Sequence, residues 1–521
     1  MGRFRLTTPA KILLVGVVAV GVVGGVCAGA KSGFIKMDDN PVKQETTVNK
    51  NDDKPVVKPA DKTDRTTINL SLDEWIGWKP IIDANQGLAT QPGSIFDELG
   101  LDVNIHIIND ATDSSNALIK GDLDAAGYTT NRLAFLSGKF QSAGFDVVVP
   151  VYTNYSNGGD GIIAKDSIQT VDDLVGAKIG VPQFSEAHTL VAWFVDNSDL
   201  SEEDKAAIMN NLILFDTPDD AAKAFFAGQV DVAATWQPYL SQAEEMAGGH
   251  VLFDTSTSSK LIMDCIVFDE EFATANPEAV TKFIDGVFQA EDMYMNEFGY
   301  IKEVMPMFST ESDDSIKASA MDADLAGYKE NIEILDVDAP MVYLDMCDIW
   351  TSLGETVDSS VAQNLFDDTY VKALSDKYST IEDAEDKFEL TEEQQISAKE
   401  AVALLKKSCT VNFVTDTANF LDSTEAANTL KEFVDIAQVL DGAVITIEGN
   451  INSASYMDEE AGKILSENRA NTVKKFMVAN GIDPNRIIVI GNGATQMVAD
   501  PSGPDAHLNR RTDISFKTIE G

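Results

Sequence analysis

A short sequence pattern occurs twice in this chain, and the two copies limit how it can fold. Residues 121–126 read GDLDAA, and residues 228–234 read GQVDVAA. Each copy follows a predicted short helix and leads through a strand into a polar or aromatic turn. Between them, residues 149–161 read VPVYTNYSNGGDG, a β-prone run whose glycines suit a crossing between lobes. Two α/β units of one plan predict a two-lobed clamshell, although helix, glycine and strand also recur by chance in α/β proteins.

The length and charge of the chain exclude some functions. At 521 residues it is too long for one hydrophobic core, so several domains are expected. Its 39 basic and 85 acidic residues give a formal net charge of −46. Nucleic-acid phosphates need clustered Lys and Arg, so this balance argues against a nucleic-acid partner. It suits an ectodomain with a solvated acidic surface.

The N-terminus predicts a membrane segment. Residues 12–30 are uncharged and apolar and follow basic residues. As a helix this run would span about 30 Å, the thickness of one bilayer core. We expect residues 1–35 to be a signal anchor with the N-terminus inside and the bulk of the chain extracytoplasmic. Cleavage as a signal peptide after AGA, residues 28–30, is the alternative. Residues 36–66, rich in Lys, Asp, Thr and Pro, predict a disordered tether.

The remaining chain divides into a large and a small α/β unit. We expect a clamshell over 67–380, with lobe 1 at about 67–152 and 252–380 and lobe 2 at about 153–251. A charged, helix-favouring segment over 381–409 is interpreted as a helical connector. Residues 410–521 form the second unit.

Several elements of this division are specific enough to be tested. We expect a helix over 314–328, helix-favouring sequence throughout 382–408, and a strand over 411–413.

Cysteines and histidines predict no cofactor or metal site. Besides Cys27 in the apolar run, three cysteines are scattered along the chain: Cys265, Cys347 and Cys409. One disulfide is possible, but no framework is indicated. The four histidines show no metal-binding spacing. Ser185, Glu186 and His188 share one helix start without a nucleophile pattern, so we expect no enzyme.

The candidate ligand site lies in the turns beyond the strands, where α/β folds gather ligands. Helix starts at Thr129 and Ser185 offer N–H groups to an anion, and tryptophans offer apolar walls. Asp160 and Asp264 favour an amine or cation if they face the cleft; otherwise they accept backbone N–H groups. The candidate ligand-binding residues are Trp75, Trp78, Thr112, Thr129, Asn157, Asp160, Ser185, His188, Trp236 and Asp264.

Residues 68–380 resemble the solute-binding proteins of ABC importers of the nitrate/sulfonate/taurine type. The resemblance lies in GDLDAAG (121–127), NGGDGIIAK (157–165), DLVGAKIGVP (173–182), AFFAGQVDVAATWQPYLSQA (224–243) and MDCIVF (263–268). It implies a type II periplasmic-binding fold. It also implies a receptor that delivers a small polar or anionic solute, of the nitrate, sulfonate, taurine or phosphate class, to an ABC permease.

Residues 410–521 resemble the OmpA-like peptidoglycan-binding domain. The matching motifs are IEGN (447–450), LSENRANTV (465–473), GNG (491–493) and NRR (509–511). The resemblance implies that Arg469 takes a carboxylate of the wall peptide and that Arg510 lies at the same site. The family's acid, which pairs with the ammonium of diaminopimelate, is replaced by Asn452. That departure puts wall affinity in question.

Together the two units resemble fused proteins of the phosphate-type ABC substrate-binding/OmpA group. They predict a receptor in the cell envelope, held to the membrane at one end and to peptidoglycan at the other. One alternative is a membrane-to-peptidoglycan scaffold or sensory receptor that does not transport. A second is an enzyme related to pyrimidine-precursor synthases of the same fold, which use His and Cys clusters that this sequence lacks.

Overall fold

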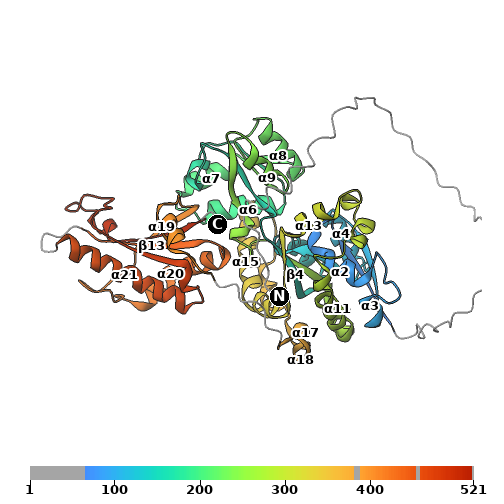
Figure 1. Ribbon diagram of the computed structural model, residues 1–521. Helices are drawn as coiled ribbons and strands as arrows, with labels where there is room; N and C mark the ends of the chain where they lie inside the picture. Colours follow the sequence, from blue (N-terminus) through green and yellow to red (C-terminus); the bar gives the residue numbers. More distant parts are fainter. Residues whose placement is uncertain (1–64, 381–387, 453–457, 519–521) are drawn as a thin grey trace, which may run out of the picture.

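The computed structural model describes residues 65–380, 388–452 and 458–518 (Figure 1). The expected membrane segment and tether fall outside these ranges. Within them, no helix combines the length and the apolar character needed to cross a membrane.

The first sheet belongs to lobe 1. Its six strands, in spatial order, are β11 (Ala323–Leu325), β4 (Val147–Ser156), β10 (Met263–Asp269), β3 (Ala125–Thr129), β1 (Thr66–Leu72) and β2 (Leu101–Ile107). β1 runs parallel to β2 and β3, whereas β10 runs antiparallel to β3 and β4. Central strands such as β10 are buried along nearly their whole length, as expected for a sheet covered on both faces.

The second sheet belongs to lobe 2. Its five strands, in spatial order, are β7 (Ile213–Phe215), β6 (Ile179–Pro182), β8 (Val232–Trp236), β5 (Asp160–Lys165) and β9 (Gly249–Asp254). β6 runs parallel to β7 and β8, and β5 runs antiparallel to β8 and β9.

The two sheets follow one plan, so the two-lobed α/β interpretation is confirmed. In each, one strand (β1 or β6) pairs parallel with an edge strand (β2 or β7) and with a second strand (β3 or β8). That second strand pairs antiparallel with a strand that follows a crossing between the lobes (β10 or β5). The repeated aspartates occupy equivalent positions. Asp124 accepts a hydrogen bond from the backbone N–H of Asn69 at 2.7 Å, and Asp231 accepts one from that of Lys178 at 3.0 Å. Each aspartate thereby fixes the strand that follows it to its parallel neighbour.

Helices cover the sheets of both lobes. In lobe 1 these are η2 (Ile76–Trp78), α2 (Lys79–Asn85), α3 (Ile95–Glu98), α4 (Ala111–Ile119), α5 (Thr130–Ala143), α10 (Glu270–Ala275), α11 (Pro277–Ala290), η5 (Glu291–Met293), α12 (Gly299–Val304), η6 (Pro306–Phe308), α13 (Asp313–Ala320), α14 (Tyr328–Glu333), the π-helix η7 (Ile334–Asp338), α15 (Ala339–Ser352), η8 (Ser359–Val361), α16 (Ala362–Leu365), α17 (Thr369–Lys372) and α18 (Ser375–Tyr378). In lobe 2 they are η3 (Val171–Leu174), α6 (Glu186–Asp196), α7 (Glu202–Asn210), α8 (Pro218–Phe226) and α9 (Tyr239–Glu245), and η4 (Thr255–Thr257) lies between the lobes.

The C-terminal domain has a four-stranded sheet of its own. Its order is β12 (Leu405–Cys409), β15 (Thr512–Lys517), β13 (Val444–Asn450) and β14 (Ile487–Gly493). The accompanying helices are α19 (Glu392–Glu400), α20 (Ser423–Val439), α21 (Glu459–Ala479), η9 (Pro484–Arg486) and η10 (Ala506–Asn509). Figure 1 places this domain, in orange and red, beside lobe 2.

Three expected elements were wrong. The helix over 314–328 is interrupted by β11, because Ala323–Leu325 pairs with β4 at the sheet edge. The helix-favouring stretch that ends at 408 contains β12, which pairs antiparallel with β15. The expected strand over 411–413 contributes only an isolated bridge between Phe413 and Phe420. In the first two cases pairing at a sheet edge decides the structure of a short segment whose local pattern is weak, and in the third no sheet pairs with the segment beyond that bridge.

Candidate functional site

Two chain segments connect the lobes, and the predicted site lies around them. The first runs from Ser156 at the end of β4 to Asp160 at the start of β5, and the second from β9 to β10. Gly158 has a φ of 86°, a left-handed conformation that favours glycine, which makes this sharp crossing possible. We call residues 156–160 the first hinge strand and residues 254–263 the second hinge strand, using 'strand' in the sense of a connecting chain segment.

An ion pair joins the lobes next to the hinge. The guanidinium of Arg132, in the first turn of α5, lies 3.0 Å from Glu186 Oε2 and 3.1 Å from Oε1, and Glu186 opens α6 of lobe 2. The hydroxyl of Thr129 donates to the same carboxylate at 2.9 Å. Burial alone would raise the pKa of Glu186, but the charge and hydrogen bonds of Arg132 lower it below its usual value. Glu186 is therefore held as a carboxylate.

A second contact between the lobes is mainly apolar. The amide of Asn131 donates to Thr189 of α6 at 2.8 Å, and the ring of Phe135 stacks on Phe184 with centroids 5.2 Å apart. Trp350, on α15, packs against both rings and donates from its indole N–H to the backbone carbonyl of Asn131. Helices α5, α6 and α15 thus hold the lobes together on this side.

Three carboxyl groups converge where the strands of both lobes end. Asp73, after β1, is exposed. Asp160 is half-buried, and burial raises its pKa to about 7. Asp264, on β10, is 4% exposed, and burial raises its pKa well above the usual value, with further increases from the charges of Asp73, Glu186 and Asp160. We call Asp73, Asp160, Glu186, Asp264 and Arg132 the interlobe junction. It holds four carboxyl groups and one guanidinium.

None of Asp73, Asp160 and Asp264 forms an ion pair within the described part of the chain. Asp160 accepts a hydrogen bond from Ser156 at 2.8 Å, and Asp73 accepts one from the indole of Trp78 at 2.5 Å. Of the three, Asp264 is buried, and a buried carboxylate without a counter-charge is costly and responds by holding its proton or by binding a cation. The junction therefore favours a ligand with a group that donates hydrogen bonds.

The three candidate tryptophans differ in position. The indole N–H of Trp75 donates to Asn154 at 2.9 Å, and its ring lies against Gly159 of the first hinge strand. Trp78 is buried in lobe 1 and donates from its N–H to Asp73 of the junction. Trp236 is 40% exposed and its N–H lies 3.3 Å from Asp219 at the start of α8.

Four further candidates have structural roles or lie apart. Thr112 is exposed on α4, and the amide of Asn157 donates to Asp324 of β11 at 2.6 Å. Ser185 caps α6 by accepting from the backbone N–H of His188 and donates to the carbonyl of Pro182. His188 is buried against the edge of Trp350, and burial lowers its pKa to about 4.

The sequence interpretation missed two junction residues and a neighbouring asparagine. Asp73, Asn154 and Arg132 were not singled out, and Glu186 was considered only for acid–base chemistry. The sequence could have indicated a role for Arg132, because this residue follows the N-cap Thr129 by three residues and so lies in the first turn of the helix. A cation in the first turn of a helix opposes the helix dipole, and such a placement requires a partner.

The candidate wall-binding residues Asn452 and Arg469 contact different segments of the C-terminal domain. The amide of Asn452 donates to the carbonyl of Pro501 at 3.1 Å, and its oxygen accepts from Asn509 at 2.9 Å. Arg469, on α21, donates to the carbonyl of Thr417 at 3.0 Å, with its guanidinium 4.9 Å from the centre of the Phe413 ring. Arg510 is exposed.

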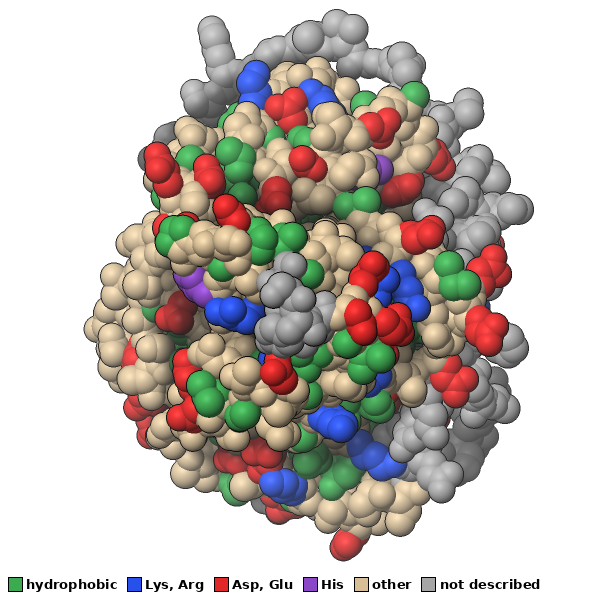
Figure 2. Space-filling view, turned by 90° about the vertical axis from the view of Figure 1, so that its left-hand side faces the viewer, with side chains coloured by type: hydrophobic (Ala, Val, Ile, Leu, Met, Phe, Trp, Pro, Cys, Tyr) green, Lys and Arg blue, Asp and Glu red, His purple; other side chains and the backbone are tan. Residues whose placement is uncertain are grey.

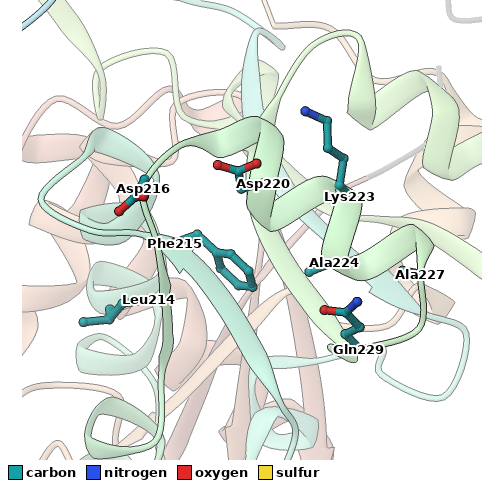
Figure 3. Close-up of a pocket in the computed structure, with 8 residues that line it drawn as sticks. All are labelled: Leu214, Phe215, Asp216, Asp220, Lys223, Ala224, Ala227 and Gln229. Carbon is teal, nitrogen blue, oxygen red and sulfur yellow. The ribbon is translucent and has the colours of Figure 1, made fainter. Parts of the chain in front are cut away.

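A groove on lobe 2 contains none of the predicted ligand residues. It has a volume of about 550 Å³ and lies between β7 and α8 (Figure 3), lined by Leu214, Phe215, Asp216, Asp220, Lys223, Ala224, Ala227 and Gln229.

On the face that Figure 2 shows, acidic side chains are spread among basic and hydrophobic ones. The acid excess on this face therefore forms no single patch.

The cysteines do not support a disulfide within the described ranges. Cys265, Cys347 and Cys409 are each buried and unbridged. Among the residues that the structure places, no group of three or more His, Cys, Asp or Glu side chains could hold a metal ion.

Comparisons with known proteins identify both units. Residues 89–297 match the family model described as NMT1/THI5 like, and residues 412–511 match that of the OmpA family. The chain therefore carries an NMT1/THI5-like domain followed by an OmpA domain, which confirms both resemblances.

Curated relatives cover parts of the chain. Putative binding proteins of Brucella abortus and Brucella melitensis are 26% identical over 210 residues, which is 39% of this chain and 61% of theirs. The chain thus spans about three fifths of the length of these relatives. Outer membrane protein A of Bordetella avium is 34% identical over 93 residues, 18% of this chain and 47% of that protein.

Solved structures give weaker likenesses. The periplasmic aliphatic sulphonate binding protein of Escherichia coli is 16% identical, with a TM-score of 0.44, over 59% of this chain and 99% of that one. The periplasmic nitrate-binding protein of Synechocystis is 10% identical, with a TM-score of 0.43, over 61% of this chain and 90% of that one.

Proposed function

We propose that this protein is a solute receptor of the cell envelope that hands a small polar solute to an ABC importer. The observation that carries the proposal is the interlobe junction, where side chains from two lobes of one plan meet beside the hinge strands. The match to the NMT1/THI5-like family and to relatives named as putative binding proteins supports it. A solute that contacts both lobes favours closure by the difference in its affinity for the two states.

The charges of the junction favour a particular member of the nitrate, sulfonate, taurine and phosphate class. Asp160 and Asp264 would accept an ammonium group, while an anionic group would compete with Glu186 for the guanidinium of Arg132. An aminosulfonate such as taurine offers both groups on one short molecule. Free nitrate or phosphate would leave the carboxyl groups without a counter-charge.

Titration calorimetry of the full chain tests this proposal with a matched set of ligands. Taurine is compared with ethanesulfonate, which lacks the amine, and with ethylamine, which lacks the sulfonate, and nitrate and phosphate complete the panel. We expect taurine to bind at least about tenfold more tightly than ethanesulfonate, because one charge-assisted hydrogen bond contributes about 1.5–3 kcal/mol.

The outcomes separate two claims. Equal binding of taurine and ethanesulfonate would keep the receptor and reject the ammonium contact. If no member of the panel binds, the receptor proposal fails, and the scaffold or sensory alternative gains support.

We further propose that the OmpA domain holds the receptor to peptidoglycan, and that Asn452 weakens this attachment. An amide cannot supply the negative charge that pairs with an ammonium group, and the oxygen of Asn452 is already occupied by Asn509. Sedimentation with purified peptidoglycan should therefore recover more protein for Asn452→Asp than for the wild-type chain.

The matched control is Asn485→Asp, which adds the same charge at an exposed position of the same domain. If both variants sediment like the wild-type chain, the wall contact does not depend on position 452.

The membrane anchor expected at residues 12–30 remains a proposal, with the N-terminus inside the cell.

A further inference from the structure

The C-terminal domain contacts the second hinge strand directly. The turn between α20 and β13 places Asp441 against this strand, where its carboxylate accepts hydrogen bonds from the backbone N–H of Ser259, at 3.0 Å, and from the Ser259 hydroxyl. The next residue, Gly442, donates from its backbone N–H to the carbonyl of Thr257 at 3.1 Å. Three hydrogen bonds therefore join two adjacent residues of the domain to two residues of the hinge.

The approach of the two backbones is too close for a side chain. A Cβ at Gly442 would lie 2.6 Å from the carbonyl oxygen of Ser256 and 2.9 Å from the Cα of Thr257. Both neighbours are backbone atoms, so they cannot move aside like a flexible side chain. The position requires glycine because of this contact.

The second hinge strand transmits this contact to the first. The hydroxyl of Thr255 accepts from the backbone N–H of Gly158 at 2.9 Å and lies 2.8 Å from the hydroxyl of Ser156. Ser156 in turn donates to Asp160 of the interlobe junction at 2.8 Å. Within the second hinge strand, the backbone N–H of Ser258 donates to the carbonyl of Thr255 at 3.1 Å. Short chain segments and hydrogen bonds thus lead from the C-terminal domain through both hinge strands to a candidate ligand residue.

The domain also contacts lobe 2 at a separate point. The backbone N–H of Ser408, on β12, donates to Asp199 of lobe 2 at 3.2 Å. A pocket of about 290 Å³ is lined by residues of α6 and its C-cap, of α15 and of α20, so both lobes and the domain border it. In lobe 1, Asp338 holds the next hinge residue, Lys260, at 2.8 Å. A rotation of lobe 2 away from lobe 1 could not preserve all of these contacts.

We infer that the C-terminal domain fixes the hinge of the clamshell, so that displacing this domain changes the opening equilibrium of the lobes. The inference rests on the proposed function only where it gives that opening a role in solute capture. Coupling is reciprocal, so a wall contact that moves the domain would alter solute affinity, and solute would alter the wall contact by the same factor.

Hydrogen exchange of the full chain, read by mass spectrometry without any ligand, tests the inference. Asp441→Ala removes the contact from the domain side, and Gly442→Ala forces the backbones apart. In both variants we expect peptides covering 156–162 and 255–262 to exchange about tenfold faster, because their local opening becomes easier. Asp505→Ala, at an exposed position of the same domain, should leave both peptides unchanged.

Peptides from β13 provide the check on folding, since they must keep wild-type exchange. If they do not, Ser259→Ala decides, because it removes one of the same hydrogen bonds from the clamshell side. Faster exchange at 255–262 alone, or at neither segment, would overturn the inference. Since no solute is used, this result is independent of the ligand panel.

Discussion

Replacing Lys79 by methionine is expected to destabilise the clamshell by about 3–5 kcal/mol, because the change leaves a buried acid without its ion-pair partner. Lys79 and Asp83 lie one turn apart on α2, with side chains fully buried and 2.5 Å between Nζ and Oδ2. Burial lowers the pKa of Lys79 and raises that of Asp83 to about 7, and the pair's mutual attraction opposes both shifts. Lys79 also donates to the carbonyl of Met293 at 3.0 Å.

Urea unfolding followed by tryptophan fluorescence measures this loss. All five tryptophans of the chain lie between residues 75 and 350, so the signal reports the clamshell and not the C-terminal domain.

The matched control is the double variant Lys79→Met/Asp83→Leu, which replaces both charges by apolar groups of similar size. Buried ion pairs replaced in this way often lose little stability. Asp83 Oδ1 has no hydrogen-bond partner among the described residues, so replacing this pair breaks fewer hydrogen bonds than replacing a fully bonded one. A single variant as stable as the wild-type chain would show that Asp83 takes up a proton at no cost.

Much of the architecture could be predicted because it repeats. The aspartates at 124 and 231 recur in sequence and make the same backbone contact in each lobe, so local pattern and tertiary role agree. Short edge strands carry no such agreement. β11 and β12 form because a neighbouring strand has a free edge with which they can pair. The three to five residues of each segment do not by themselves predict that pairing.

The site was harder to predict than the fold, for a physical reason. Asp160 and Asp264 could be identified because each lies on or next to a recognisable strand of its own lobe. The pairing of Arg132 with Glu186 depends on how two lobes close against each other, and periodicity within either lobe does not report that. Lys79 shows the same limit, since a lysine in a helix is usually exposed and here it is fully buried.

Asp160→Asn is expected to stabilise the clamshell at pH 8 by about 2–4 kcal/mol, because it removes the cost of ionising a carboxyl with a raised pKa, a cost that the partial exposure of Asp160 reduces. Burial raises the pKa of this carboxyl from 3.8 to about 7 in the folded chain. Between these values the folded protein holds a proton that the unfolded chain has released, so stability falls as pH rises through about 7. Asparagine carries no charge to desolvate and can still accept from Ser156. Urea unfolding at pH 5 and pH 8 should therefore show the gain mainly at pH 8.

Asp231→Asn is the control of opposite sign in the same sheet. The hydrogen bond from Lys165 lowers the pKa of Asp231, so its contribution to stability is present at neutral pH and is lost only as pH falls through the lowered value. This variant should lose stability at both pH values. If Asp160→Asn also loses stability at pH 8, its carboxylate already has a counter-charge, and the case for a cationic group on the solute fails. A stabilised variant that no longer binds taurine would instead show that the charge is retained for binding at the expense of the fold.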